Sequence, residues 1–267
     1  MSMQYTGGAQ VDGVSIAVTG ATVKLTRKPI LPELVWGKGW KVNYAAGHFE
    51  PSLNLTFPLF QAYIAKLKDK AIGVPGRDTS FSAFADNGGV KATFTECKVE
   101  SWTIRADALG NSPVECTLGL AARNASTAAG GGGSAFAPNQ SLGHTPIPAY
   151  ALTTTAGVAP SSIITAVDIN VNNNPFRLYT LNGEIIPVSI QLGLMIVTGT
   201  FTYYSADATG SIAVDTNTTL TISGDLDLSL PDCLITDISD NIEGPNRKPM
   251  RVVSFEAIGT ANTAPIS

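Results

Sequence analysis

The chain has 267 residues, enough for one large domain or two smaller ones. Its net charge of −4 argues against nucleic-acid binding through a basic surface, and only 14% of its residues are charged. The first residues lack the basic and apolar regions of a signal peptide, and no apolar run approaches the roughly 20 residues of a membrane helix. Low charge with many Thr, Ser, Asn, Gly and Val residues favours β-structure with broad surfaces that meet other protein; an ordinary neutral β-protein is the alternative.

Charge is unevenly distributed along the chain. Residues 1–125 contain 13 Lys or Arg and 10 Asp or Glu, a balance of +3, whereas residues 163–267 contain 4 and 11, a balance of −7. This unevenness either reflects solvation alone or lets unlike faces of the protein meet.

The first half of the sequence predicts strands and one helix. Period-two alternation or β-branched enrichment marks the strands, with Gly, Pro and Asn at the joins. The predicted strands cover residues 21–26, 39–46, 52–59, 90–96, 98–106 and 113–122. A helix is predicted over about 59–72, with Pro58 fitting its first turn. Its apolar face consists of Phe60, Tyr63, Ile64 and Leu67.

A segment without charge follows. No Asp, Glu, Lys or Arg occurs from Asn124 to Val167, and this stretch is rich in small residues, Pro and Thr. It also contains apolar residues such as Phe136 and Ile147, which favour a strap lying on protein surface over a free tether. We therefore predict a linker strap over residues 123–162.

The second half again reads as strands, and its counterpart of the helix is a much poorer helix former. The predicted strands cover residues 165–171, 185–192, 195–204, 219–230, 234–240 and 250–258.

The two halves resemble each other. A shift of 146 residues places Pro29 on Pro175, Gly37 on Gly183 and Thr56 on Thr202. A shift of 136 places Cys97 on Cys233 and Pro113 on Pro249, so one deletion of ten residues between 204 and 225 reconciles the two shifts. Any one of these matches could arise by chance, but their common order predicts a tandem duplication of modules at 1–122 and 163–267.

The sequence offers little catalytic chemistry. The three cysteines lack metal-ligand spacing, and Cys97 with Cys233 reads as one copied position between successive strands, packed as a small hydrophobe. Only His48 and His144 could supply imidazole chemistry, and no nucleophile-elbow or zinc-protease motif occurs. The acids of "GDLDLSLPDC" could form a weak calcium site but read better as solvated surface. We predict a structural protein rather than an enzyme, with no catalytic, cofactor or metal site.

Two pairs of motifs carry a family resemblance. Each half has a long early loop, "TRKPILPELVWGKGW" or "NNNPFRLYTLNGE", followed by a strand, "SLNLTF" or "TGTFTY". This arrangement resembles the major tail tube protein of tailed bacteriophages and the related inner-tube proteins of type VI secretion systems, over roughly residues 15–122 and 163–261. The resemblance implies an all-β fold with a minor helix, built as two tandem β-sandwich or barrel modules.

The resemblance also implies a function. Family rings contain six modules, so three copies of a two-module chain would form a trimeric, pseudo-hexameric ring, as in some long non-contractile tails of siphoviruses. Stacked rings would make the tail tube, a virion component made in the host cytoplasm, with the tape-measure protein in its lumen. Tail terminator and tail-tip or baseplate proteins would cap it, DNA would pass without specific binding, and no membrane is involved. We expect a neutral or acidic lumen, with the Lys and Arg residues of the first half mostly outside it or at subunit contacts.

The loops at 27–38 and 174–184 are predicted to contact the neighbouring ring, although their Pro and Gly residues could equally just shape turns. The predicted ring-stacking residues are Pro29, Trp36, Gly37, Pro175, Leu181 and Gly183. The alternative function is a double β-sandwich that decorates a capsid or binds glycans, which the Trp residues and Thr-rich surface favour. A β-rich hydrolase would need a carboxylate pair in a cleft.

Overall fold

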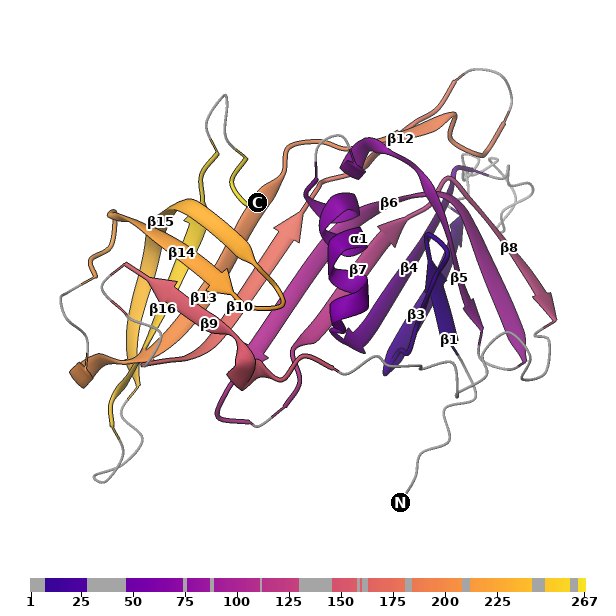
Figure 1. Ribbon diagram of the computed structural model, residues 1–267. Helices are drawn as coiled ribbons and strands as arrows, with labels where there is room; N and C mark the ends of the chain where they lie inside the picture. The colour runs from indigo at the N-terminus through magenta and orange to yellow at the C-terminus, as the bar shows by residue number, and fades with distance from the viewer. Residues whose placement is uncertain are drawn as a thin grey trace, which may run out of the picture.

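The chain folds into one large curved sheet with a helix on one side (Figure 1). The computed structural model describes residues 8–27, 47–73, 76–86, 89–110, 112–129, 146–157, 159, 163–180, 184–207, 212–241, 248–259 and 264–267. Within these residues the protein is all-β with a single α-helix, which confirms the predicted all-β class with a minor helix; the two tandem modules stay a prediction. The predicted strand at 39–46 lies outside the described residues.

The first half contributes eight strands and the helix. These are β1 (Gly8–Val11), β2 (Val14–Ile16), β3 (Gly20–Arg27), β4 (Phe49–Pro58), α1 (Gln61–Ala71), β5 (Phe81–Asp86), β6 (Val90–Asp107), β7 (Glu115–Ala121) and β8 (Asn124–Ala129). The second half contributes β9 (Thr153–Ala156), β10 (Ile164–Asn172), β11 (Phe176–Leu178), β12 (Ser189–Gln191), β13 (Ile196–Tyr204), β14 (Asn217–Ser223), β15 (Leu228–Asn241) and β16 (Met250–Ala257). Short 3₁₀ turns occur at η1 (Gly76–Asp78), η3 (Ala149–Ala151) and η4 (Ser205–Asp207).

Strict alternation of apolar and polar residues explains why the strands that cover the core form. Along β4, residues such as Leu53, Leu55 and Phe57 are fully buried, while the residues between them are half-buried or exposed. The same period of two runs along β10. One face of the sheet therefore packs into the core and the other stays polar, the pattern expected of an antiparallel sheet with one open face.

The helix lies close to its predicted position. It begins at Gln61 and ends at Ala71, and its apolar residues Tyr63, Ile64 and Leu67 are buried against the sheet. Pro58 is the last residue of β4 and not part of the helix, which corrects that prediction. The pairing of Pro58 with Glu115 of β7 extends the strand up to the residues just before the helix.

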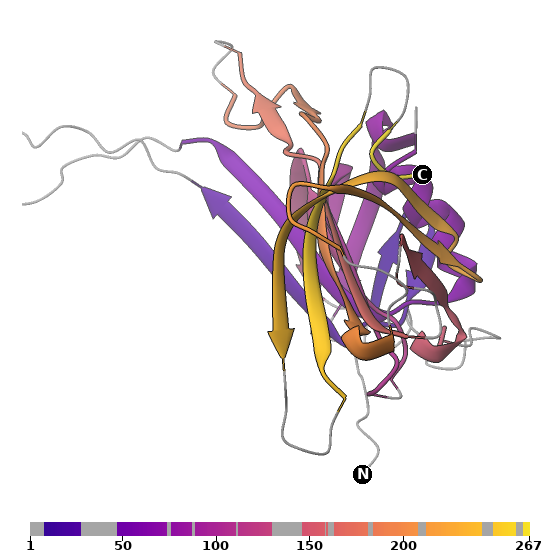
Figure 2. The same ribbon diagram turned by 90° about the vertical axis from the view of Figure 1, so that its left-hand side faces the viewer.

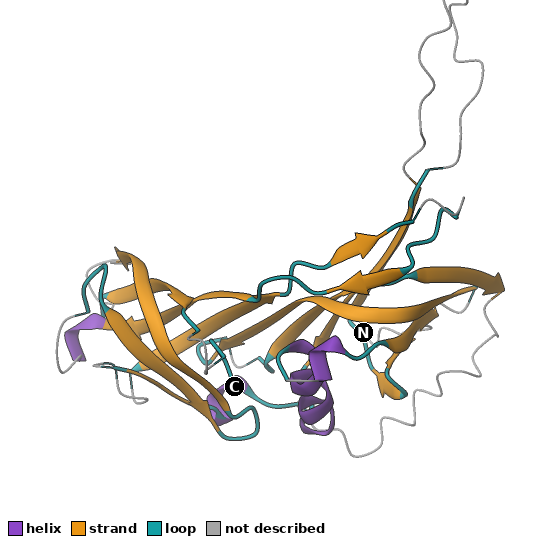
Figure 3. Cartoon of the chain, turned by 90° about the horizontal axis from the view of Figure 1, so that it is seen from above, coloured by secondary structure: helices purple, strands orange, loops and turns teal. Residues whose placement is uncertain are grey.

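Strand β6 joins two elements that the sequence separates. The predicted strands at 90–96 and 98–106 form one strand of 18 residues, and Glu96 lies at a positive φ of 51° where they meet. Before this point β6 pairs with β5 and β8; beyond it β6 pairs with β7 and β10. The bend thus lets one strand pair with different neighbours along its two parts; Figures 2 and 3 show the whole sheet from the side and from above.

The two halves use the same strand registers. In β3–β4 Thr22 faces Asn54, and in β10–β13 Asp168 faces Thr200, so a shift of 146 residues maps one pair onto the other. The pairing of β4 with β7 corresponds to that of β13 with β16 once β7 is shifted by 135 residues. This shift is one residue smaller than the alignment of Pro113 with Pro249 predicts.

Irregularities repeat as well. The register of β6–β7 shifts between Val99 and Ser101, and that of β15–β16 shifts between Ile235 and Asp237, 136 residues further on. The hairpins β5–β6 and β14–β15 also each contain a bulge. Because β-bulges are specific features rather than defects, their matched positions are a further likeness between the halves.

The segment predicted as a strap lies against both halves. Its residues 146–149 lie beside the first half, where the Ile147 amide donates to the Leu59 carbonyl at 2.9 Å and the Val114 amide donates to the Ile147 carbonyl at 2.8 Å. Ile147 is buried. Further on, β9 pairs with β14 in the register that β1 uses with β5.

Candidate functional surface

The strands β3, β4, β7, β6, β10, β13, β16 and β15 succeed one another in an inner sheet, and within the described residues both of its ends have an open edge. Among the described strands β3 pairs with β4 alone, and all eight of its residues are exposed. At the other end, β15 from Asp237 to Asp240 pairs with β16, and no described strand pairs with its opposite side. Open edges present backbone N–H and C=O groups that can bind another strand, so these two edges are the chain's clearest binding surfaces.

A seam between the halves shows how one edge binds another. Strand β6 of the first half pairs with β10 of the second, which places Trp102 opposite Val171 and Ile104 opposite Ile169. All four side chains are buried. The seam is therefore a continuous β-ladder with an apolar face.

Charge and hydrogen bonds reinforce the other face of this seam. The Arg105 Nε and Nη2 atoms lie 3.0 and 2.9 Å from Asp168 Oδ2, and Thr103 Oγ1 donates to Asn170 Oδ1 at 3.2 Å. The Arg105 side chain is 67% exposed, so this ion pair contributes little stability and serves mainly to set register.

A buried side-chain amide just after β10 binds two carbonyls of the first half. Asn173 is fully buried, and its Nδ2 donates to the Ala71 carbonyl at 2.9 Å and to the Val99 carbonyl at 3.2 Å. It thereby connects the second half to the end of α1 and to β6. The helix makes a further contact, because Gln61 Nε2 donates to Asp225 Oδ1 at 2.9 Å.

The face of the inner sheet that points away from α1 is polar. Thr56, Thr117, Thr103, Asn170 and Thr198 succeed one another in register across five adjacent strands. The row continues into a carboxylate, Glu256, on β16. Hydroxyl and amide groups dominate this row, and the Arg105 guanidinium on the same face is paired with Asp168, so the face offers few free cations to a polyanion.

The β11–β12 hairpin leaves the sheet and lies on the first half. Arg177 Nη2 donates to the Pro51 carbonyl at 3.0 Å, and the Tyr179 ring stacks on His48 with centroids 3.6 Å apart. Large apolar side chains stay exposed on the hairpin and beside it, at Phe176 (45%), Leu178 (38%) and Val188 (43%).

One of the predicted ring-stacking residues, Pro175, lies next to this hairpin. Pro175 is half-buried and directly precedes β11. The other five, Pro29, Trp36, Gly37, Leu181 and Gly183, lie outside the described residues. Their role stays a prediction.

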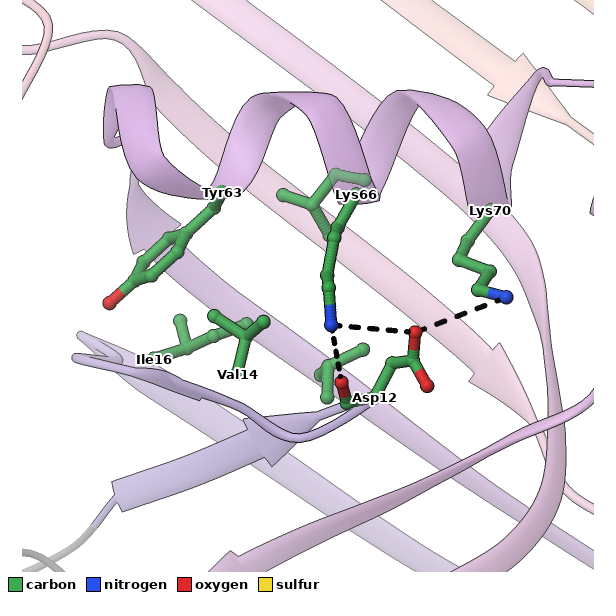
Figure 4. Close-up of a pocket in the computed structure, with 8 residues that line it drawn as sticks. Asp12, Val14, Ile16, Tyr63, Lys66 and Lys70 are labelled. Carbon is green, nitrogen blue, oxygen red and sulfur yellow. Dashed lines mark hydrogen bonds and ion pairs between the residues drawn. The ribbon is translucent and has the colours of Figure 1, made fainter. Parts of the chain in front are cut away.

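A cavity beside the helix is too small for a ligand. It lies between α1 and the β1–β2 hairpin and has a volume of about 10 Å³, room for one water molecule at most (Figure 4). Tyr63 and Ile16 line it, while Lys66 Nζ donates to the Asp12 carbonyl at 3.0 Å and Lys70 Nζ lies 3.9 Å from the Asp12 carboxylate. These contacts attach the helix to the hairpin.

The titratable groups of the described residues form no reactive constellation. Burial raises the pKa of each cysteine thiol, Cys97, Cys116 and Cys233, to about 12, so the thiols stay protonated and unreactive. No group of three His, Cys, Asp or Glu residues in the described part could hold a metal ion. No described helix is long and apolar enough to cross a membrane.

Sequence reasoning missed the two open edges. The alternation of 21–26 and 234–240 predicts strands but says nothing about which neighbours flank them. An indirect signal was present in the uneven charge, because the β3 edge carries Lys24 and Arg27 whereas the β15 edge carries Asp237 and Asp240.

Comparison with known proteins adds one match. A family model described as "Phage tail tube protein" matches residues 6–259, nearly the whole chain. No curated protein matches the chain.

Proposed function

The chain belongs to the phage tail tube protein family, and on that premise we propose that three copies close into a pseudo-sixfold ring whose stacks form the hollow tube of the tail. Membership makes the protein a structural component of the virion tail that assembles with copies of itself. The ring size and its passage for DNA are the proposed parts.

The repeated registers support two modules per chain. Five strand pairings of the first half recur in the second, with the same antiparallel sense and with matched bulges. The sequence predicts a first module of residues 1–122; we extend it to β8 (Asn124–Ala129), inside the predicted strap, because β8 pairs with β6. The second module begins at β9, inside the predicted strap of 123–162, because β9 takes the place of β1.

The observation that carries the proposal is the match between the seam and the open edges. Within the chain, β6 of the first module joins β10 of the second. The counterpart of β10 in the first module is β3, and the counterpart of β6 in the second is β15. These two strands hold the open edges, so the same join can link one copy to the next. Unlike edges that meet head to tail close a ring when the rotation per step divides a full turn.

The polar face lines the lumen in this arrangement. The row from Thr56 to Thr198 lacks cations, and the Arg105 guanidinium nearby is paired with Asp168. Tight binding of DNA requires cations that release counterions from phosphates, so such a lining lets DNA pass. The tape-measure protein fills the lumen before ejection, and tail terminator and tail-tip proteins close the ends. The loops at 27–38 and 174–184 face the next ring.

Electron microscopy and native mass spectrometry of the purified protein test the ring. We expect hollow filaments, and rings with the mass of three chains. Leu25→Asp places a charge on the β3 edge and abolishes both, whereas Leu109→Asp, which changes an exposed residue beyond the end of β6, does not. A discrete single-chain particle under polymerising conditions would instead favour a capsid-decoration or glycan-binding module.

A further inference from the structure

The two open edges carry opposite charges. Strand β3 contains Lys24 and Arg27 but no acid, and the open part of β15 contains Asp237 and Asp240 but no base. Lys24 and Asp237 are exposed, and neither forms an ion pair within the described residues. Asp240 is held by Arg251 Nε at 2.7 Å.

The seam within the chain fixes the register in which a second copy would pair. Subtracting 146 from a β10 residue and adding 136 to a β6 residue gives the corresponding pair at the open edges. The seam pair Asn170–Thr103 then becomes Lys24 opposite Ser239. In the same register the pair Val171–Trp102 becomes Leu25 opposite Ile238.

The side chains suit this register. Leu25 is 41% exposed in the single chain, and Ile238 packs against the edge of the core, so their contact removes apolar surface from water. Lys24 stands diagonally across from Asp237 on the polar face. Diagonal neighbours on paired strands are about 7–8 Å apart, within reach of a lysine side chain.

The polarity of this contact is the reverse of that within the chain. In the internal seam the cation is on β6, at Arg105, and the anion is on β10, at Asp168. At the open edges the cation is on β3, the counterpart of β10, and the anion is on β15, the counterpart of β6. A β3 strand placed against β6 would bring Lys24 diagonal to Arg105, which is repulsive.

We propose that this reversed polarity selects the correct partner: the acidic edge of β15 accepts the basic β3 of the next copy, and β6 rejects it. The inference rests on the proposed ring and names the surface that closes it. Specificity of this kind needs a repulsive element against the wrong partner as well as an attractive one for the right partner.

Charge exchange tests the polarity. Lys24→Glu and Asp237→Lys each raise the critical concentration for assembly about fivefold, the factor that corresponds to ~1 kcal/mol per cross-strand pair. The double variant restores wild-type assembly. Lys91→Glu makes the same charge change on β6 away from both edges, over the Phe84 ring, and serves as the control. Single variants that assemble like wild type, or a double variant no better than either, would overturn the proposal.

Cysteine cross-linking tests the register independently of charge. Lys24→Cys with Ser239→Cys, oxidised in assembled material, yields covalent trimers on a non-reducing gel. Thr22→Cys with Ser239→Cys, which lies on the same face but two residues out of register, yields few. The native thiols are buried and give no background. Efficient linking by the displaced pair alone contradicts the register while the tube function stands; if the wild-type protein forms no ring at all, the proposed function itself fails.

Discussion

Asn173 offers a direct test of what holds the two halves of the chain together. Replacement by Ala removes the Nδ2 hydrogen bonds to the Ala71 and Val99 carbonyls. Each such bond is worth about 1 kcal/mol net, so Asn173→Ala should lower the free energy of unfolding by about 2 kcal/mol. The loss is not larger because Asn173 Oδ1 has no hydrogen-bond partner among the described residues, and its removal relieves a buried unsatisfied acceptor.

Asn173→Asp should lower the free energy of unfolding further than Asn173→Ala. It keeps the shape of the side chain but replaces the donor with a carboxylate oxygen that faces two carbonyl oxygens in a fully buried site. Burial of an uncompensated acceptor and charge should bring the total loss to about 4 kcal/mol at neutral pH. The aspartate variant is thus expected to be less stable than the alanine variant, although it is closer in shape.

Urea denaturation of the unassembled chain, followed by tryptophan fluorescence, measures both losses. Asn170→Ala is the matched control, because Asn170 lies only three residues earlier, on β10, but is exposed and accepts one hydrogen bond from Thr103. It should cost less than about 1 kcal/mol. An alanine variant as stable as wild type, or an aspartate variant at least as stable as the alanine one, would refute the conclusion that the buried Asn173 amide holds the second half to α1 and β6.

Three further outcomes follow from the packing. The three cysteines should resist a thiol reagent at pH 8 until the chain unfolds, because burial raises the pKa of each thiol to about 12. The free energy of unfolding should be unaffected by these thiols below their unfolded pKa, and should fall as the pH rises from there toward 12. Gly199→Ala should cost about 2–3 kcal/mol in thermal unfolding, because its Cβ would meet the Asp168 carbonyl and the Phe255 ring, whereas Gly119→Ala meets only movable side-chain ends and should cost less than half as much. Arg177→Ala should speed limited proteolysis at the β11–β12 hairpin, since its hydrogen bond to the first module is lost.

Local pattern predicted much of the fold because burial imposes a period. The alternation of 52–59 and 165–171 corresponds to β4 and β10, and the helical spacing of 59–72 corresponds to α1. The burial of Cys97 and Cys233 agrees with their prediction as small hydrophobes. In each case a side chain's environment depends on its immediate neighbours in sequence.

Features that depend on distant partners could not be predicted in this way. The alternation on both sides of Glu96 gives no sign that β6 continues through it, because the continuity comes from β5 and β7 on opposite sides. Likewise β9, "TTTA", resembles the rest of the uncharged segment and becomes a strand only by pairing with β14. The open edges are the extreme case, since in the proposed ring the partners that define them belong to another copy.

In the proposed ring, a chain with two modules has an option that single modules lack. Six identical modules must form six identical seams, so each edge charge has to serve every contact. With two modules per chain, one seam is intramolecular and carries Arg105 against Asp168, and the other is free to carry Lys24 against Asp237. Only three contacts per ring then bear the translational and rotational entropy cost of association. In the proposed ring the opposite polarity of the two seams would fix the alternation of modules, because a wrong join would place like charges side by side.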